Sequence, residues 1–433
     1  MNALGNILKI PELRKRIFLT LLLLGVYRIG CHIPTPGIDR EALSSFLQQA
    51  GGMLGLFNIF TGGAFERFSV FALGIMPYIS AAIIMELLTV VIPQLQLLKK
   101  EGEYGRRKIN QYVRYGTVLL CLFQGFGLAL GLEGLRGTGG EAIVINPGWG
   151  FRLTTMLTLA TGTTFLMWLG EQITERGIGN GISLIIFAGI VARIPREIAA
   201  IWRLVRVGEM NVIFGLLLAL FAVAVVAFVI FMETSYRRIP IQYAKRIVGR
   251  RVYGGQSAFL PLKLNTSGVI PPIFASSLLM FPTTVANFIH HPVMDLIKKV
   301  FDPMGVVYNL CYVVLIVFFA YFYTAIIFNP VDVADNMKKY GGFIPGIRPG
   351  KPTADYIDKV LSRITLIGGL YVALVCVLPA ILMGKFNVPF YFGGTAILIV
   401  VGVALDTVQQ IEAHLLSRQY ESIVKGVRIK GRR

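Results

Sequence analysis

Residues 71–88, FALGIMPYISAAIIMELL, are apolar enough to sit in a bilayer, yet they carry features that membrane helices rarely contain. Gly74 and Pro77 interrupt the first half of this stretch, and the acid Glu86 lies in its second half. Pro77 removes one backbone donor near a helix start, and Gly74 permits a tight bend one turn earlier. The preceding residues 51–68, GGMLGLFNIFTGGAFERF, are apolar but too short and glycine-rich to span. The sequence therefore predicts a broken segment followed by a new helix.

Ile75, Ile79 and Glu86 share one face of this new helix, because Glu86 lies 11 positions after Ile75, about 16 Å further along. An ionisable residue in a membrane helix is expected to face water or a partner. The face is then one wall of a cavity, dry at the isoleucines and wet at the cytosolic end, where Glu86 is a funnel residue. Ordinary packing of the isoleucines, with Glu86 reaching the interface near Pro93, explains the same spacing, and periodicity does not choose between these interpretations.

The composition indicates a polytopic membrane protein. Of 433 residues, 55% are hydrophobic and 15% are charged, with a mean hydropathy of +0.67. A single soluble core cannot bury that much apolar surface. Apolar runs of about 20 residues, enough to cross about 30 Å of hydrocarbon, occur about ten times. Their approximate limits are 17–34, 69–92, 115–132, 152–170, 181–200, 212–232, 266–289, 306–328, 360–383 and 388–409.

The net charge of +19 would suit a nucleic-acid partner, but its distribution favours a role in membrane topology. With the N-terminus inside, the N-terminal arm, the inner loops near 93–114, 171–180, 233–265 and 329–363, and the tail 410–433 carry 30 of the 42 lysine and arginine residues. The positive-inside rule therefore predicts that both termini are cytoplasmic. The exception is an outer segment with four arginines close together, which leaves the limits of the fifth span open: Arg193, Arg196, Arg203 and Arg206.

The spans divide into two halves of five. We expect an N-terminal half at 1–200, a connecting loop at 201–211, a C-terminal half at 212–409 and a cytosolic tail at 410–433. An odd number of spans in each half gives the halves opposite orientations, which is the topology of an inverted repeat. This expectation rests on counting spans, because the halves show no sequence similarity to each other.

Two inner loops are long and basic. Residues 233–265 alternate apolar and polar side chains, with Ile239, Ile241 and Tyr243 on one face, which predicts a hairpin that projects into the cytosol. Residues 329–363 contain the stiff stretch GGFIPGIRPG. Bases that only set topology and contact lipid headgroups would explain the charge but neither of these patterns. The loops therefore favour docking of a large cytosolic partner.

The sequence carries no recognisable catalytic or metal-binding arrangement. HExxH, paired acids within a span and Ser/His/Asp sets at usable spacing are absent from the sequence. The glycine-rich GIGNG at 177–181 joins two apolar helices without a preceding strand, so a tight cytosolic turn is favoured over a phosphate loop. The four cysteines lack CxxC pairing and indicate small core residues. We expect neither an enzyme nor a cofactor.

Motifs along nearly the whole chain resemble the SecY family of protein-conducting channels. They are FALGIMPYISA, KKEGEYGRRKINQY, WLGEQITERGIGNGIS, YAKRIVGRRVYGGQS, GVIPPIFASS, FNPVDVADNMKKYGGFIPGIRPG, DKVLSRITL and VPFYFGGTAILIVV. No property of the family is carried over to residues 133–148 or 287–305. It implies an all-α polytopic protein whose two inverted five-helix halves form an hourglass pore with a plug helix.

The resemblance also implies specific site residues. The motifs give a constriction ring at Ile75, Ile79, Ile182, Ile186, Ile273 and Ile399. They give a plug at about 57–67 that includes Phe57, Asn58, Ile59, Phe60, Phe65 and Arg67. A lateral gate toward lipid is implied at Ser80, Ile83, Asn265 and Phe281. Branched aliphatic side chains suit such a ring because they exclude water yet offer a passing polypeptide no specific bond.

The family resemblance implies specific partners, which the charge of the loops alone could not identify. The basic loops are expected to dock the ribosome or the motor ATPase SecA through Arg237, Arg238, Lys245, Arg246, Arg250, Arg251, Arg348 and Lys351. The small membrane subunits SecE and SecG, signal peptides, nascent chains and lipids complete the expected partners, in the bacterial cytoplasmic membrane. A solute transporter would instead need charges around a midplane site, whereas Glu86 and Asp406 lie toward span ends. A lipid scaffold without a pore leaves the matched isoleucines unexplained.

Overall fold

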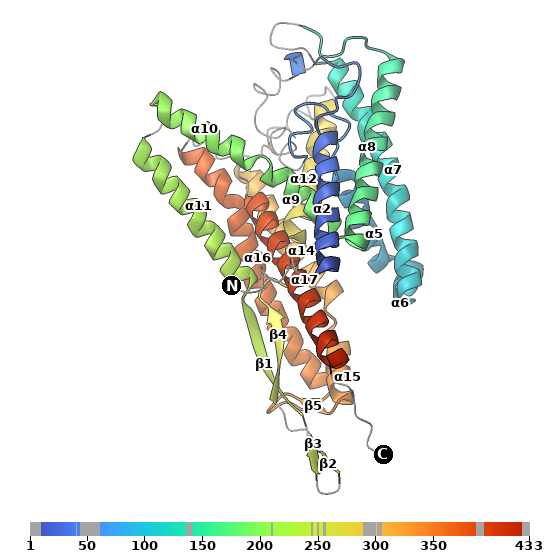
Figure 1. The fold of residues 1–433 in the computed structure, drawn as a ribbon, viewed down its shortest axis with the longest axis vertical. Helices are drawn as coiled ribbons and strands as arrows, with labels where there is room; N and C mark the ends of the chain where they lie inside the picture. The colour runs from blue at the N-terminus through green and yellow to red at the C-terminus, as the bar shows by residue number, and fades with distance from the viewer. Residues whose placement is uncertain are drawn as a thin grey trace. The chain divides into compact units, whose positions relative to one another are not determined.

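The computed structural model describes residues 10–39, 41–43, 61–135, 141–208, 211–243, 246–248, 251–253, 257–288, 300, 305–386 and 394–426. Its helices and strands (Figure 1) fall into two compact units. The first unit comprises Met1–Arg203, Phe281–Asp302 and Ile399–Arg433, and the second comprises Leu204–Met280 and Pro303–Leu398.

The first unit is built from helices. They are α2 (Pro11–Gly30), α5 (Met76–Val91), α6 (Pro93–Lys100), α7 (Glu103–Glu133), α8 (Trp149–Arg176), α9 (Gly181–Val191), α10 (Ile194–Val207, whose last residues belong to the second unit), the end of α12 (Ile270–Phe288) from Phe281 onward and the part of α17 (Gly394–Gly426) from Ile399 onward. Helix α7 packs along α8, and α5 packs on α7 (Figure 1).

Ion pairs join α7 to α8 near both ends of the two helices. Arg114 Nε lies 2.8 Å from Glu171 Oε1 at one end. At the other end, two nitrogens of Arg152 donate to Glu133 Oε2 at 2.7 and 3.0 Å. Between them, a Cβ on Gly125 would lie 3.3 Å from Met156 Cα, so glycine lets the backbones approach closely. The pairing makes α7 and α8 an antiparallel hairpin.

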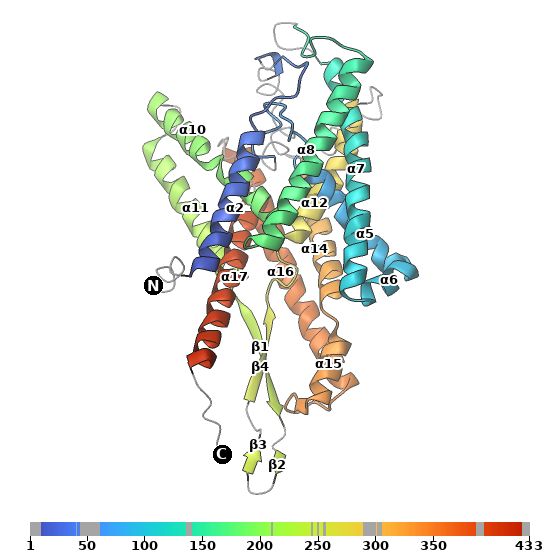
Figure 2. The same cartoon turned by 45° about the vertical axis from the view of Figure 1, so that its right-hand side comes forward.

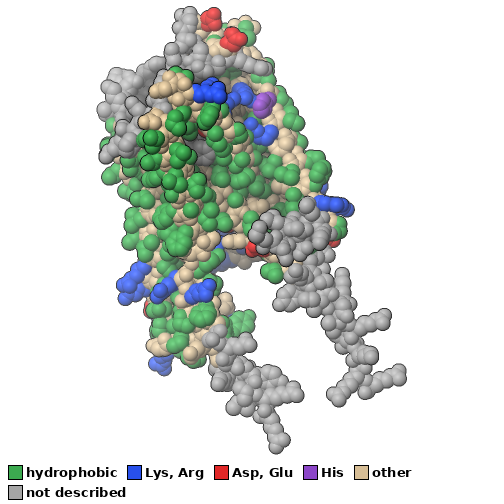
Figure 3. Space-filling model, turned by 60° about the vertical axis from the view of Figure 1, so that its left-hand side comes forward, with side chains coloured by type: hydrophobic (Ala, Val, Ile, Leu, Met, Phe, Trp, Pro, Cys, Tyr) green, Lys and Arg blue, Asp and Glu red, His purple; other side chains and the backbone are tan. Residues whose placement is uncertain are grey.

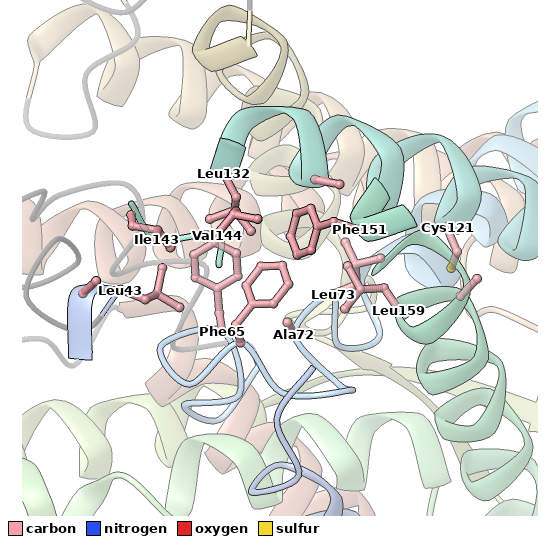
Figure 4. Packing of buried hydrophobic residues seen from close by; sticks show 14 residues of the cluster. Leu43, Phe65, Ala72, Leu73, Cys121, Leu132, Ile143, Val144, Phe151 and Leu159 are labelled. Carbon is pink, nitrogen blue, oxygen red and sulfur yellow. The ribbon is translucent and has the colours of Figure 1, made fainter. Parts of the chain in front are cut away.

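A hydrophobic cluster fills the space beside this hairpin (Figure 4). Phe65, Ala72 and Leu73 meet Leu132 of α7 and Phe151 of α8 there, and all five are buried. The cluster therefore ties the chain before α5 to the α7–α8 hairpin. Its other buried members are Ala42, Leu43, Phe68, Cys121, Ala129, Ile143, Val144, Leu159 and Ala160.

The second unit combines helices with two small sheets. Its helices are α11 (Val212–Glu233), α12 (Ile270–Phe288) as far as Met280, α14 (Val306–Ile327), α15 (Pro330–Lys339), α16 (Lys351–Phe386) and the first turn of α17. Its strands are β1 (Tyr236–Tyr243), β2 (Arg246–Val248), β3 (Arg251–Tyr253), β4 (Ser257–Lys263) and β5 (Gly342–Phe343). Helix α14 packs along α16.

The predicted hairpin at 233–265 is confirmed. Strands β1 and β4 pair antiparallel, and β2 and β3 form a second short hairpin beyond them (Figure 2). Ile239 and Ile241 are 2% and 5% exposed and pack with residues of α15 and α16, as their shared face predicts. Strand β5 also pairs with β1, so the second basic loop joins the first in one sheet.

Each of the ten predicted spans overlaps a helix, but two of the spans are not continuous helices. Within 69–92 the helix begins only at Met76, because Gly74 adopts φ +58° and turns occupy the residues before it. Within 181–200 a turn at Ala192 and Arg193 separates α9 from α10, and Pro195 lies in the first turn of α10.

Five helices are long and apolar enough to cross a membrane on their own, and up to seven when each sharply bent pair counts as one span, among the residues described. Several helices are longer than the predicted spans, because polar residues that favour helix extend them. Helix α7 already starts at Glu103, and α16 already starts at Lys351. Helix α11 leaves Val212, Ile213 and Leu216 at least 64% exposed. Hydrophobic side chains are likewise spread widely over the face shown in Figure 3. Such exposure suits contact with lipid.

Candidate functional site

The candidate site centres on the chain that leads into α5, residues 61–75, called the turn segment below. It contains no helix and runs through consecutive turns. Gly62, Gly63 and Gly74 have positive φ values of +64°, +87° and +58°, which glycine adopts without strain. Ile75 then caps α5, and Pro77 lies in the first turn of that helix. Pro77 therefore starts α5, as the sequence predicts, since a proline in the first turn sacrifices no helical hydrogen bond.

Helix α2 holds the start of the turn segment by its backbone. Tyr27 Oη donates to the carbonyl of Thr61 at 3.3 Å, and Arg28 Nη1 donates to the carbonyl of Gly62 at 3.0 Å. Tyr27 is 2% exposed, so its hydroxyl is committed to this contact inside the protein. Arg28 was not singled out from the sequence, although a lone arginine late in an apolar span is a signal of a buried partner.

Helix α9 contacts the start of the turn segment through a glycine, Gly189. A Cβ on Gly62 would lie 2.7 Å from Gly189 Cα, and a Cβ on Gly189 would lie 3.3 Å from Gly62 Cα. The two backbones therefore touch where neither residue has a side chain. Gly189 follows Ile186 by three residues, so this contact lies about one turn from a predicted ring residue.

The far end of the turn segment is held by α8 and by an aromatic stack. Thr163 Oγ1 donates to the carbonyl of Gly74 at 3.2 Å. The ring of Phe71 lies between Tyr27 of α2 and Phe165 of α8, with centroid separations of 6.2 and 6.1 Å. The turn segment is thus fixed at both of its ends by side chains far away in the sequence.

The predicted plug falls partly outside the described residues. Phe57, Asn58, Ile59 and Phe60 lie there, whereas Phe65 and Arg67 belong to the turn segment. The resemblance implies a helix over 57–67, but residues 61–67 form turns, because Gly62 and Gly63 take up positive φ. Phe65 is 7% exposed and packs in the cluster of Figure 4. Glu66 next to it lies 3.3 Å from Arg196 of α10.

The predicted ring residues are largely buried. In the first unit, Ile75, Ile79 and Ile186 are 3%, 8% and 4% exposed, and Ile182 is half-buried. Ile399, the first residue of the last chain segment in this unit, is also buried. In the second unit, Ile273 is 9% exposed, one turn into α12. All six are branched aliphatic side chains carried on helices or a helix cap, and none can hydrogen-bond.

Glu86 has a partner that the sequence did not reveal. Its Oε1 lies 2.8 Å from Lys99 Nζ, and both side chains are more than a third exposed. Lys99 belongs to α6, which is bent by 100° from α5 at Ile92. The ion pair therefore bridges the bend, and Glu86 faces both water and a partner.

The predicted gate residues lie on both units. On α5, Ser80 is half-buried and Ile83 is 8% exposed. Asn265 is 5% exposed, and its Nδ2 donates to Glu233 Oε1 at 2.7 Å and to the carbonyl of Gly268 at 3.0 Å. These bonds join the end of α11 to the turn before α12. The backbone of Phe281 lies in α12, and its side chain is outside the described part.

The predicted docking residues that the structure describes lie on strands of the second unit and in the loop and helix that follow β5. Arg237 and Arg238 are exposed on β1, and Arg348 is exposed in the loop that follows β5. Thr353 Oγ1 donates to the carbonyl of Arg348 at 2.9 Å and fixes that loop to the start of α16. Lys351 is the exposed first residue of α16. Arg246 and Arg251 lie on β2 and β3, and Lys245 and Arg250 are outside the described residues.

The predicted tight turn at GIGNG is confirmed between α8 and α9, where the chain bends by 114°. Its backbone donors are taken up by side chains: Ile178 donates to Thr20 Oγ1 at 3.1 Å, and Gly179 donates to Gln410 Oε1 at 3.0 Å. Asn180 caps α9. Among the described residues, His, Cys, Asp and Glu form no group of three that could hold a metal ion.

Known sequences similar to this chain are found along its length. The sequence model of the SecY family matches residues 69–408. The protein translocase subunit SecY of Escherichia coli (strain K12) is 52% identical over 425 residues, covering 97% of this chain and 96% of that protein. The SecY subunit of Vibrio cholerae serotype O1 is 51% identical over 431 residues, covering 98% and 96%.

Solved structures share the fold at lower sequence identity. One described as a protein conducting channel superposes with a TM-score of 0.68 at 18% identity, covering 98% of this chain and 99% of the other. Sec61 in a canine ribosome–channel complex superposes with a TM-score of 0.64 at 17% identity, also covering 98% and 99%. These likenesses confirm the expected all-α polytopic fold, and the chain is a multi-pass membrane protein.

The contact between Gly62 and Gly189 predicts a local loosening on substitution. Gly189→Val places a branched side chain against the backbone of Gly62, so the turn segment must move away from α9. In a cysteine-free background, Ser69→Cys, at a position 0% exposed, should then react with a maleimide at least about tenfold faster, as expected for a lower local opening free energy.

Gly150→Val is the matched control, because a Cβ there meets nothing within 4 Å. It should leave the labelling rate of Ser69→Cys unchanged. Equal rates in the Gly189→Val and Gly150→Val proteins would show that the glycine contact does not hold the turn segment.

Proposed function

Because this chain belongs to the SecY family, we propose that it is the pore-forming subunit of a protein translocase. It would act as a passive channel that moves unfolded polypeptides across the membrane and releases transmembrane segments sideways into lipid. The observation that carries the proposal is the match to SecY subunits at 52% identity over 97% of the chain. It is a transport protein and not an enzyme.

The isoleucines are proposed as the constriction of the channel. A ring of Ile75, Ile79, Ile182, Ile186, Ile273 and Ile399 would exclude water and ions by dewetting, because branched aliphatic side chains bind neither. It would also widen around any polypeptide sequence, since it offers no hydrogen bond or charge that favours one side chain over another. A selective filter would need carbonyls or charges instead.

Residues 57–67 are proposed as the plug that closes this ring. The anchored turn segment supports the proposal, because the contacts of Thr61 and Gly62 with α2 would fix the C-terminal part of the plug in place. One solved structure with a TM-score of 0.65 is described as a SecY protein whose plug domain stabilises the closed state and maintains a membrane seal. Phe65 and Arg67 would then belong to the base of the plug.

Ser80, Ile83, Asn265 and Phe281 are proposed as lateral-gate residues. The mixture of small polar and apolar side chains would give an interface weak enough to part when an apolar signal segment enters. Asn265 would contribute by holding the loop before α12 to Glu233, so that this helix starts from a fixed point.

The two basic loops, 233–265 and 329–363, are proposed as the docking platform for SecA or the ribosome, which would supply the energy for transport. The basic residues of these loops suit phosphate or acidic contacts: Arg237, Arg238, Lys245, Arg246, Arg250, Arg251, Arg348 and Lys351. The Sec61 structure in a ribosome–channel complex supports a ribosome partner. SecE, SecG, signal peptides, nascent chains and lipids are the remaining proposed partners.

We place the protein in the bacterial cytoplasmic membrane with both termini cytoplasmic, from the distribution of its lysine and arginine residues. The proposed organisation is two halves at 1–200 and 212–409, with the linker 201–211, the loops 233–265 and 329–363, and the tail 410–433. Opposite orientation of the halves would place a constriction between two funnels, the cytosolic one lined in part by Glu86.

A secondary transporter is less well supported by the charged residues. Coupled transport needs ionisable groups or broken helix ends around a midplane site. Glu86 is already paired with Lys99 at the α5–α6 bend, and Asp406 is exposed on α17. Neither acid is available to a buried solute.

The channel function is tested by a photoreactive amino acid at Ile79. A stalled, signal-bearing nascent chain should form an adduct at position 79, because the ring contacts the chain throughout transport. The same probe at Ile84, 46% exposed on the same helix, is the control and should give little adduct. Active export without an adduct at position 79 would remove Ile79 from the translocation path.

The seal is tested by Ile79→Gly/Ile186→Gly. Removing both side chains should wet the constriction and raise the resting ion conductance of a planar bilayer by about tenfold or more. Ile84→Gly/Leu157→Gly carries the same helix cost at exposed positions and should leave the conductance low. Identical conductance in the two proteins would exclude the isoleucines from the seal.

The docking role is tested by Arg348→Glu. Reversing this exposed charge should reduce SecA-driven export by roughly tenfold, by weakening electrostatic contact with the motor. Assembly, measured by co-purification of the small subunits, should be normal. Lys100→Glu, an equal charge reversal on α6, should export normally, and normal export by Arg348→Glu would contradict docking at this loop.

A further inference from the structure

Phe68 in the turn segment has a backbone conformation that side chains disfavour. Its φ is +42°, and among the described residues it is the one residue other than glycine with a positive φ. In this left-handed region the Cβ comes too close to the following carbonyl oxygen, so a bulky aromatic residue there is strained. Such a conformation persists only where the surrounding structure enforces it, and it is typical of sites that switch between states.

Backbone hydrogen bonds enforce this conformation from two sides. The N–H of Phe68 donates to the carbonyl of Phe65 at 3.0 Å, and its carbonyl accepts from the N–H of Thr35 at 2.9 Å. Val70 donates its N–H to the carbonyl of Ile33 at 2.9 Å. The chain that follows α2 therefore lies antiparallel to the turn segment and fixes the peptide group after Phe68.

The chain that follows α2 is braced in turn by the chain that leads into α8. Asp39 donates its N–H to the carbonyl of Ile143 at 2.9 Å, and Ile145 donates to the carbonyl of Gly37 at 3.2 Å. This second pairing has the same antiparallel pattern as the first, with one bridge in each. Residues 33–39 thus connect the turn segment to the loop between α7 and α8.

Packing of the Phe68 ring offsets the cost of its backbone. The residue is 1% exposed, and its ring centroid lies 6.3 Å from that of Phe65 in the buried cluster beside the α7–α8 hairpin. Ser69, the next residue, is 0% exposed and donates its N–H to the carbonyl of Ala64 at 2.9 Å. The strained residue is thus buried and bonded on each side, so the strain is retained as long as these contacts last.

Phe68 also lies at the boundary between two parts of the chain. The plug at 57–67, on which the hinge described next rests as part of the proposed function, ends directly before it. Residues 69–75 lead from it into α5. A change of backbone conformation at one residue redirects all of the chain on one side of it. A return of Phe68 to negative φ would therefore turn the base of the plug away from Tyr27 and Arg28.

We propose that Phe68 is a strained hinge for the plug, held in the left-handed conformation in the closed channel and relaxed when the plug leaves. The bonds to residues 33–35 and the burial of the ring favour the closed state, whereas the strain favours the open one. The two states then differ little in free energy, so a signal segment needs to supply little to shift between them. Phe68 is a positioning residue, because it acts through the backbone that it directs and contacts no substrate.

Phe68→Ala and Phe68→Gly isolate the strain, because both remove the ring and only glycine removes the left-handed penalty. Opening of the plug base is measured in the full-length protein, with the subunits that co-purify, as maleimide labelling of Ala64→Cys in a cysteine-free background. Ala64 is 0% exposed. The Phe68→Gly protein should label roughly threefold to tenfold more slowly than the Phe68→Ala protein, since relief of strain stabilises the closed state. Equal rates, or faster labelling of the glycine protein, would overturn the proposal.

Phe65 provides the matched control. Its side chain is 7% exposed in the same cluster, and its φ is not positive. Phe65→Gly should label at least as fast as Phe65→Ala, because glycine gives the open chain more conformational freedom and relieves no strain there. The order of the alanine and glycine proteins should thus reverse between the two positions. Slower labelling of the glycine protein at both positions would be a general effect of glycine and would also overturn the hinge.

Resting ion conductance in planar bilayers tests whether the strain acts on the seal. The Phe68→Gly protein should leak less than the Phe68→Ala protein, by a factor similar to that in labelling. If Ile79→Gly/Ile186→Gly leaks while the two Phe68 proteins conduct equally, the hinge is wrong and the channel function stands. If none of these proteins leaks, the channel function fails and the hinge fails with it.

Discussion

Non-helical backbone inside a membrane protein is stable only where its polar groups find partners within the protein, and side chains of two other helices supply such partners to the turn segment. Tyr27 and Arg28 supply donors to carbonyls at its start, and Thr163 supplies one at its end. Gly62 and Gly189 allow the backbones to come close enough for this arrangement. The position of α5, and with it the positions of Ile75 and Ile79, follows from these contacts.

Several charged residues of the first unit likewise have partners within the protein. Arg28 donates a hydrogen bond to the carbonyl of Gly62. Arg196 forms an ion pair with Glu66, and Glu86 forms one with Lys99 across the bend between α5 and α6. Further ion pairs close both ends of the α7–α8 hairpin. Charges near the membrane are thus used to fix helix ends and bends, which leaves the proposed constriction to side chains that bind nothing. A channel that must pass any polypeptide benefits from this separation, because charge in the constriction would favour particular sequences.

Several elements could be predicted from the sequence because their signals are local. Apolar length located ten segments that each overlap a helix, since crossing hydrocarbon requires about 20 residues of any apolar type. Alternation located the β1–β4 hairpin and the buried face with Ile239 and Ile241, because strand side chains alternate between faces. Gly74 and Pro77 marked the start of α5. The six ring isoleucines and the plug came from resemblance to a family, since helical spacing alone fits ordinary packing as well as a cavity wall.

The sequence by itself therefore determined that the chain crosses a membrane many times, where α5 starts and which faces of the hairpin are buried. The tertiary structure alone decided that residues 61–67 are turns, that Arg28 and Gly189 hold them, that Lys99 pairs with Glu86, and that β5 joins the sheet of the first basic loop. The physical reason is distance along the chain. Periodicity and composition report on neighbours within a few residues, whereas a carbonyl–guanidinium bond, a glycine–glycine contact or an added strand joins segments that only the folded chain brings together.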